Sequence, residues 1–255
     1  MFPLRDDNPH PPGFKPKLTI AFMAANVGVF IYQAMVAGQF WEFSSPGAAS
    51  MFYEWGAVPA CVTGSSFIEP QGIRMACPDM PYVSLLSSMF MHGGLMHLGG
   101  NMLFLWIFGD NIELKFGRAK FFLIYIAWGV GAGLAHILID PASSTPAVGA
   151  SGAISGVLGA YLALYPKVRI STFLMMGFFW RMMHIQARWF LPFWLVFQNL
   201  LPFFIGGFGV AGGGVAYMAH IGGFAIGFVT GYLYKKSHGA EFTYGTRYGW
   251  KNDYR

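Results

Sequence analysis

Four polar side chains lie within long apolar stretches of this sequence: Ser151, His220, His97 and Asn101. Polar groups in such stretches are costly to bury and usually serve a function. A serine hydroxyl becomes a useful nucleophile when a neighbouring imidazole accepts its proton. Ser151 and His220 therefore predict a serine–histidine dyad, provided that the fold brings the two side chains together.

His97 and Asn101 are four residues apart, so they share one face of a helix and can point at a single target. Acyl transfer needs hydrogen-bond donors directed at the developing oxyanion. The two side chains could supply them, together with the amides of a helix that begins near Ser151, which lack intrahelical acceptors. This set predicts a nucleophile, a base and an oxyanion hole without a cofactor or a metal. His92, five residues before His97, either orders a neighbouring loop or binds substrate.

The composition indicates that these side chains are held inside a membrane. Hydrophobic residues make up 55% of the 255 residues and charged residues only 11%, compared with roughly 25% in an average soluble domain. A helix needs about 20 apolar residues to span a bilayer. We therefore expect an all-α polytopic membrane protein with six spans, at residues 18–37, 82–108, 119–139, 148–165, 192–206 and 215–234.

The remaining segments flank these spans. A polar arm of residues 1–17 precedes the membrane domain of residues 18–234, and a tail of residues 235–255 follows it. The connection of residues 38–80 is aromatic, which predicts short helices at the membrane interface. The apolar segment of residues 170–190 is interrupted by charged side chains, so a seventh span is disfavoured. The acidic residues of the arm argue against a cleavable signal peptide and a mitochondrial transit peptide.

The basic residues set the orientation. With the N-terminus in the cytoplasm, 15 of the 16 Lys and Arg residues fall on the inner side, and only Arg74 falls outside. This explains the net charge of +5 better than a nucleic-acid partner does. Both termini are expected in the cytoplasm of a bacterial cell, with the chain in the plasma membrane. Cys61 and Cys77 then share an outer, oxidising loop, either bridged as a disulfide or as two free thiols.

Independent counts place the polar side chains at one level. From the rise of ~1.5 Å per residue, Ser151, His220 and His97 all fall ~5 to 12 Å below the outer face of the membrane. Glycines repeat at helical spacing in the fourth and sixth spans, which predicts close packing of their backbones and brings His220 to Ser151. No buried Asp or Glu is available as a third member. The small residues concerned are Gly152, Gly156, Gly159, Ala160 and Ala163 in the fourth span, and Gly223, Gly227 and Gly231 in the sixth.

Three ordered strings carry a resemblance to a known family. They are His92-Gly93-Gly94-Leu95-Met96-His97-Leu98-Gly99-Gly100-Asn101, Gly149-Ala150-Ser151-Gly152 and Ala219-His220-Ile221-Gly222-Gly223, and together they resemble the rhomboid intramembrane serine proteases. The resemblance implies a six-helix bundle open to the outer side, with Ser151 as nucleophile, His220 as general base, and His97 with Asn101 as oxyanion partners. It also implies cleavage of transmembrane protein substrates near the outer face, with the fifth span and the connection of residues 206–214 as a gate.

One position departs from that pattern. Many members of the family carry an aromatic residue four positions after the nucleophile, stacked on the catalytic histidine, whereas this chain has Ser155. Ser155 is also a second candidate nucleophile. Ser151 is favoured because Gly149 precedes it by two residues and because it lies nearer the start of its helix.

Other readings of the same residues remain. Taken alone, Ser151 could be a packing residue that bonds its own backbone, and His97 with Asn101 could be a structural hydrogen-bonded pair. A catalytically inactive relative that binds membrane clients would be expected to lose Ser151 or His220, and both are present. A haem or metal protein could use His97, His136 and His220 as ligands, but no HExxH or CxxC spacing supports this.

Overall fold

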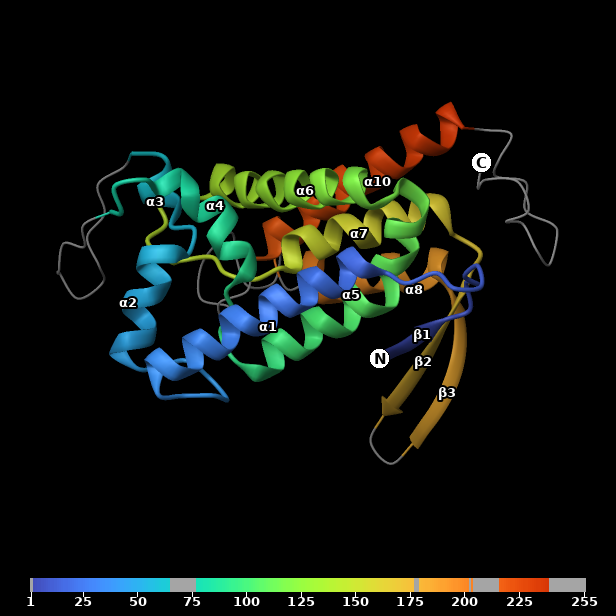
Figure 1. Ribbon diagram of the computed structural model, residues 1–255, viewed down its shortest axis with the longest axis horizontal. Coiled ribbons are helices and arrows are strands. Elements are labelled where there is room, and N and C mark those ends of the chain that lie inside the picture. Colours follow the sequence, from blue (N-terminus) through green and yellow to red (C-terminus); the bar gives the residue numbers. More distant parts are fainter. Residues whose placement is uncertain (1, 65–76, 177–178, 202, 204–215, 239–255) are drawn as a thin grey trace.

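The computed structural model describes residues 2–64, 77–176, 179–201, 203 and 216–238. Five long helices dominate it and run beside one another as a bundle (Figure 1). The bounds are Lys17–Ala37 for α1, Leu95–Phe116 for α5, Arg118–Ile139 for α6, Ser151–Leu164 for α7 and Tyr217–Ser237 for α10. The chain is therefore mainly helical.

Four of these helices match predicted spans closely. α1, α6, α7 and α10 correspond to the first, third, fourth and sixth spans, with ends that differ by only a few residues. Among the described residues, α1 and α6 are each long and apolar enough to cross a membrane, and α7 is a shorter apolar helix. The six-span arrangement is thus supported in part, from the described helices alone.

The second span was predicted with the wrong ends. Residues 82–108 do not form one helix, because the chain passes through short turns before α5 begins at Leu95. Gly94 is extended and pairs with Glu42 as an isolated β-bridge, so close that a Cβ at Gly94 would overlap the carbonyl oxygen of Trp41. This pairing ends the preceding turns and places His97 in the first turn of α5. The short elements are η1 (Pro81–Val83), α4 (Ser84–Ser87) and η2 (Ser88–Phe90).

The fifth span begins earlier than predicted and is not a uniform helix. α8 runs over Ala187–Leu195 and continues into the π-helical segment η3 over Val196–Leu200. A π-helical turn widens the helix and often marks a functional site. The proposed gate connection, residues 206–214, lies outside the described residues.

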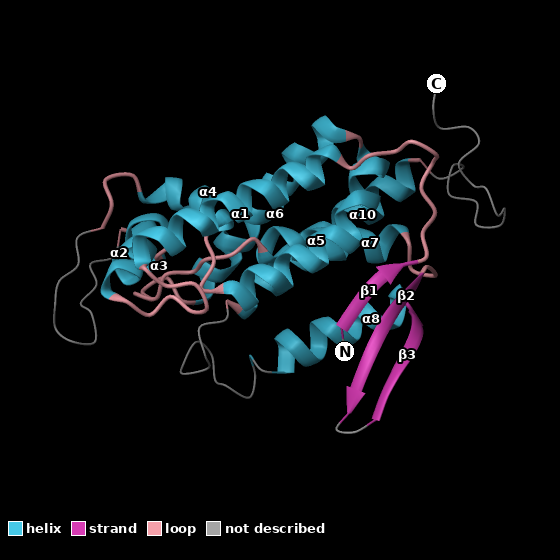
Figure 2. Cartoon of the chain, turned by 60° about the horizontal axis from the view of Figure 1, so that its bottom comes forward, coloured by secondary structure: helices cyan, strands magenta, loops and turns pink. Residues whose placement is uncertain are grey.

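A small β-sheet departs from the all-α prediction. The strands β1 (Phe2–Asp6), β2 (Arg169–Met176) and β3 (Phe179–Gln186) pair antiparallel in the order β1-β2-β3 (Figure 2). The interrupted apolar segment is therefore a hairpin, in which a seventh span has no place. The N-terminal arm supplies the third strand, a pairing between residues more than 160 positions apart that local sequence patterns do not reveal.

Buried polar groups lock the sheet and α1 to one end of the bundle. The hydroxyl of Tyr161 in α7 donates to the Asp6 carboxylate, and Nδ2 of Asn111 in α5 donates to the same oxygen over 3.1 Å. Burial raises the pKa of the Asp6 carboxyl to about 6, against the opposing effect of these hydrogen bonds. β1 is thereby joined to both α5 and α7.

Glu113 makes the corresponding contact with α1. Its buried carboxylate accepts from the amide and the hydroxyl of Thr19, both over 2.8 Å, and from the amide of Leu18 over 3.1 Å. These amides open α1, which has no side-chain cap of its own. A carboxylate at a helix N-terminus satisfies the free amides and complements the helix dipole. Arg118 lies 3.4 Å from Glu113 and balances its charge.

The opposite end of the bundle carries the predicted long connection. It contains the short helices α2 (Pro46–Trp55) and α3 (Pro59–Val62), as expected for residues 38–80. Cys61 in α3 is joined to Cys77 by a disulfide with an S–S distance of 2.02 Å. The bridge closes the loop that holds residues 65–76, which lie outside the described part of the chain.

α7 is the central helix, with 12 of its 14 residues buried. It packs backbone to backbone against α10, as predicted from the repeated glycines. A Cβ at Gly223 would overlap the carbonyl oxygen of Gly152, and one at Gly227 would overlap that of Gly156. The contact is possible only because both helices carry glycine there.

We expect Gly227→Ala to destabilise the protein, because the added methyl group would meet the backbone of α7 rather than a movable side chain. Overpacking of this kind typically costs about 1–3 kcal/mol. Thermal unfolding in detergent should therefore show a midpoint several degrees lower. The matched control is Gly28→Ala in α1, where a Cβ would have no neighbour within 4 Å. Equal midpoints for the two variants would contradict the close contact.

Candidate active site

The candidate nucleophile opens the central helix. Ser151 is the first residue of α7, and the chain enters this helix through Gly149 with φ of 129°, a conformation that favours glycine. A Cβ at Gly149 would lie 2.8 Å from Nε2 of His97 and 3.4 Å from Oγ of Ser151. The absence of a side chain at Gly149 thus lets His97 and Ser151 face the same small space.

The candidate base approaches from α10. His220 is the fourth residue of that helix, and its Nε2 lies 2.7 Å from Oγ of Ser151. This is within the normal range for a hydrogen bond. The distance follows from the glycine contact described above, since Gly223, one turn below His220, rests on the carbonyl of Gly152.

A residue that the sequence analysis missed lies on the far side of the imidazole. Oδ1 of Asn199, in η3, is 2.5 Å from Nδ1 of His220, and the Asn199 side chain is only 1% exposed. Its Nδ2 donates to the carbonyl of Trp194 over 3.5 Å. The signal was available, because Asn199 is also a polar residue in an apolar span, the criterion that identified Ser151 and His220.

The two candidate oxyanion residues occupy consecutive turns of α5. Nδ1 of His97 accepts from the amide of Gly93 over 3.3 Å, which leaves the proton on Nε2, the nitrogen that faces Gly149. Asn101 is only 7% exposed, and its Nδ2 has no hydrogen-bond partner among the described residues. An unsatisfied buried donor is unusual in a folded protein. It is suited to a group that arrives with a ligand.

His92 lies beneath His97 rather than at the surface. Its side chain is fully buried and its ring centroid is 5.1 Å from that of His97. Gln33 of α1 holds its backbone from both sides, with Oε1 accepting from the amide over 3.0 Å and Nε2 donating to the carbonyl over 3.2 Å. Of the two roles considered for His92, ordering the chain before α5 fits this burial better than contact with a substrate.

Ser155 has a different environment from Ser151. It is only 1% exposed, and its hydroxyl donates to the carbonyl of Ser151 over 2.7 Å. This is a hydrogen bond of a serine to its own helix one turn earlier. The position where relatives carry an aromatic residue is thus occupied by a helix-bonded hydroxyl, and an aromatic ring comes from elsewhere: Trp194 of α8, with its centroid 6.2 Å from that of His220.

The remaining histidines lie outside this arrangement. His184 Nδ1 is 3.0 Å from the Ser171 hydroxyl across the hairpin. His136 of α6 lines a small cavity of about 40 Å³ that also reaches Ser151, Gly149 and Ser88. Within the described ranges, no three His, Cys, Asp or Glu residues come together so that they could hold a metal ion.

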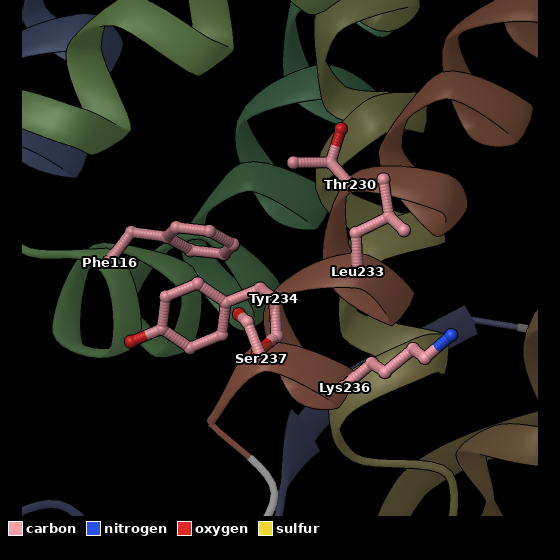
Figure 3. Close-up of a pocket in the computed structure, with 6 residues that line it drawn as sticks. All are labelled: Phe116, Thr230, Leu233, Tyr234, Lys236 and Ser237. Carbon is pink, nitrogen blue, oxygen red and sulfur yellow. The ribbon is translucent and has the colours of Figure 1, made fainter.

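A larger hollow of about 690 Å³ lies at the other end of α10 (Figure 3). Thr230, one of its lining residues, is ten positions after His220, or about 15 Å along the helix. The hollow contains none of the candidate catalytic residues. It is lined by Phe116, Thr230, Leu233, Tyr234, Lys236 and Ser237.

Comparison with known proteins is consistent with this arrangement. The model of the Rhomboid domain matches residues 80–237. The mitochondrial Rhomboid protein 1 of Saccharomyces cerevisiae is 30% identical over 163 residues, which is 61% of this chain and 42% of the relative. Rhomboid protease GluP of Bacillus subtilis is 42% identical over 78 residues, which is 31% of this chain and 15% of the relative.

Not every relative is an enzyme. Inactive rhomboid protein 1 of Drosophila melanogaster is 33% identical over 92 residues, which is 36% of this chain and 6% of the relative. The chain spans less than half of the length of each of these relatives. The Rhomboid domain is typical of intramembrane serine proteases and is also found in inactive members. Because the Rhomboid domain matches well over half of its residues, the chain belongs to the rhomboid family.

Proposed function

We propose that the chain is an intramembrane serine endopeptidase that cleaves transmembrane substrate proteins near the outer face of the membrane. The observation that carries the proposal is the distance of 2.7 Å between Oγ of Ser151 and Nε2 of His220. A serine and a histidine in this geometry form the nucleophile and base of acyl transfer. The proton on Nε2 of His97 provides a donor near Ser151, and Nδ2 of Asn101, one turn further along α5, is a second donor without a partner among the described residues.

Acylation follows from these positions. Nε2 of His220 accepts the hydroxyl proton as Oγ of Ser151 bonds to the carbonyl carbon of the scissile peptide. The negative charge that develops on the carbonyl oxygen is stabilised by Asn101, His97 and the free amides at the start of α7. Collapse of this intermediate breaks the C–N bond, and His220 returns its proton to the leaving amine.

Deacylation needs one water molecule at the ester. The cavity of about 40 Å³ beside Ser151 is large enough to admit water, since one molecule needs only about 10–15 Å³ of such space. Water attacks the ester carbon while Nε2 of His220 accepts its proton, and the proton then restores the Ser151 hydroxyl. No other group is needed to balance the reaction.

The two ends of the bundle support the proposed orientation. The candidate catalytic residues lie in the first two turns of α5 and in the first turns of α7 and α10, at one end. The basic residues gather at the other end, where Lys235 donates to the carbonyl of Ala163 and the Tyr234 hydroxyl donates to that of Lys115. The bias of Lys and Arg toward the cytoplasm then faces the site outward. We propose a bacterial plasma membrane, six spans, two cytoplasmic termini and a mobile fifth span as gate.

Removal of either member of the dyad should abolish proteolysis. In proteoliposomes, we expect the wild type to cut a model transmembrane substrate without added cofactors, and Ser151→Ala and His220→Ala to be inactive. A fluorophosphonate probe should label Ser151, as located by peptide mass. The matched control is Ser155→Ala, which should retain cutting because the Ser155 hydroxyl is bonded to its own helix.

Full activity of Ser151→Ala would contradict the proposed role of Ser151 as the nucleophile. A wild type that neither cuts nor reacts with the probe, while still binding transmembrane segments, would instead support the alternative of an inactive client-binding relative.

Loss of the unpaired amide donor should slow the chemical step. We expect Asn101→Ala to lower kcat by about 10²-fold or more, the usual effect of deleting an oxyanion donor. The control is Asn26→Ala, which truncates a buried asparagine of α1 whose Nδ2 donates to the carbonyl of Phe22 in the same helix. Equal losses of kcat in the two variants would indicate general damage to the bundle rather than a missing donor.

The disulfide gives a test of orientation. In Cys61→Ser, the exposed Cys77 becomes a free thiol, and we expect a membrane-impermeant maleimide to label it in intact cells. The wild type should be labelled only after reduction. The control is Lys236→Cys in a chain without native cysteines, because Lys236 is exposed at the inner end of α10. Labelling of that variant in intact cells would reverse the proposed topology.

A further inference from the structure

We propose that Asn199 is a positioning residue of this site, which turns the serine–histidine pair into a Ser151–His220–Asn199 triad with a neutral third member. The inference rests on the proposed function and goes beyond it, because it names the group that fixes the tautomer and the orientation of the base. It also assigns that task to the fifth span rather than to α7.

The three side chains form one line of hydrogen bonds. Asn199 Oδ1 lies 2.5 Å from Nδ1 of His220, and His220 Nε2 lies 2.7 Å from the Ser151 hydroxyl. A neutral imidazole carries a single N–H, and an amide oxygen can only accept. Nδ1 must therefore hold the proton, and the lone pair of Nε2 points at Ser151. This is the tautomer that general-base catalysis requires.

Asn199 is itself held in place. Its side chain is 1% exposed, so it cannot rotate freely into solvent. Nδ2 donates to the carbonyl of Trp194, five positions earlier, and this fixes which end of the amide faces His220. Both residues belong to the continuous α8–η3 segment, and Asn199 lies in its π-helical part.

No side chain at position 155 of α7 restrains the His220 imidazole. Ser155 is too short to stack on the imidazole, and its hydroxyl is committed to the Ser151 carbonyl. Trp194 lies 6.2 Å from His220 between ring centroids, at the far edge of ring contact. Asn199 thus hydrogen-bonds the imidazole directly on the side opposite Ser151.

A neutral partner suits this environment. A carboxylate in the apolar interior of a membrane protein is far more costly than an amide. The ionisable side chains that act on His220 from the neighbouring helices are His97 of α5 and His136 of α6, and neither carries a negative charge. Asn199 can stabilise the transient imidazolium through the dipole of its carbonyl without introducing a permanent charge.

The test compares three variants in proteoliposomes with a model transmembrane substrate. Asn199→Leu removes the acceptor at similar volume, and we expect kcat to fall about 10- to 100-fold with KM within about twofold, because tautomer and orientation affect only the chemical step. Asn199→Asp restores an acceptor, so its activity should exceed that of Asn199→Leu. The control is Gln198→Leu, an exposed neighbour in the same segment, which should behave as the wild type.

The pH profile separates positioning from a merely structural role. A carboxylate beside His220 favours its protonated form, so in Asn199→Asp the acidic limb of kcat against pH should move to higher pH. Unchanged kcat in Asn199→Leu, or an unshifted limb in Asn199→Asp, would overturn the inference. If Asn199→Leu fails to fold, the shift of the acidic limb of kcat against pH in Asn199→Asp is the test. A wild type that neither cuts nor labels with a fluorophosphonate would instead overturn the proposed function, and the inference with it.

Discussion

The site depends on the contact of two helix backbones. α7 and α10 meet through glycines so closely that a methyl group at Gly223 or Gly227 would overlap carbonyl oxygens of α7. In lipid, no hydrophobic effect draws two helices together, so small residues and the packing that they permit must do so. The hydrogen bond between Ser151 and His220 is a consequence of this contact, because both residues lie within one turn of it. Glycines usually destabilise a helix, but here they set the distance between His220 and Ser151.

The hydrogen bonding of buried polar side chains differs between the two ends of the bundle. At the basic end, Glu113 satisfies the first amides of α1, and Asp6 accepts from Tyr161 and Asn111. These bonds join α1 to α5, and β1 to both α5 and α7. At the other end, Nδ2 of Asn101 has no partner within the described residues, and Ser151 lies among the unsatisfied amides that open α7. An unpaired buried donor in a folded protein is suited to a group that arrives with a ligand, which supports the proposal that the second end holds the site.

Sequence patterns predicted what depends on local spacing. The spans of α1, α6, α7 and α10 followed from apolar runs, and the polar residues within those runs identified Ser151 and His220. The start of α5 was missed because it depends on the pairing of Gly94 with Glu42, a contact set more than 50 residues away. The sheet was missed for the same reason, since β1 and β2 come from opposite parts of the chain. Asn199 is also a polar residue in an apolar span, but a third member next to a catalytic histidine is usually expected to be Asp or Glu.

The membrane environment explains why the partner of His220 is an amide. In soluble serine proteases, a buried carboxylate often orients the catalytic histidine. Within a bilayer the same carboxylate would be as costly as the imidazolium that it serves, whereas an amide oxygen orients the ring at much lower cost. The amide must then be held rigidly, because orientation is all that it provides. Burial of Asn199 and its bond to Trp194 supply that rigidity, and they make the tautomer of His220 dependent on the packing of η3 against α10. Under the role that we propose for Asn199, the tautomer of His220 depends on the position of the fifth span.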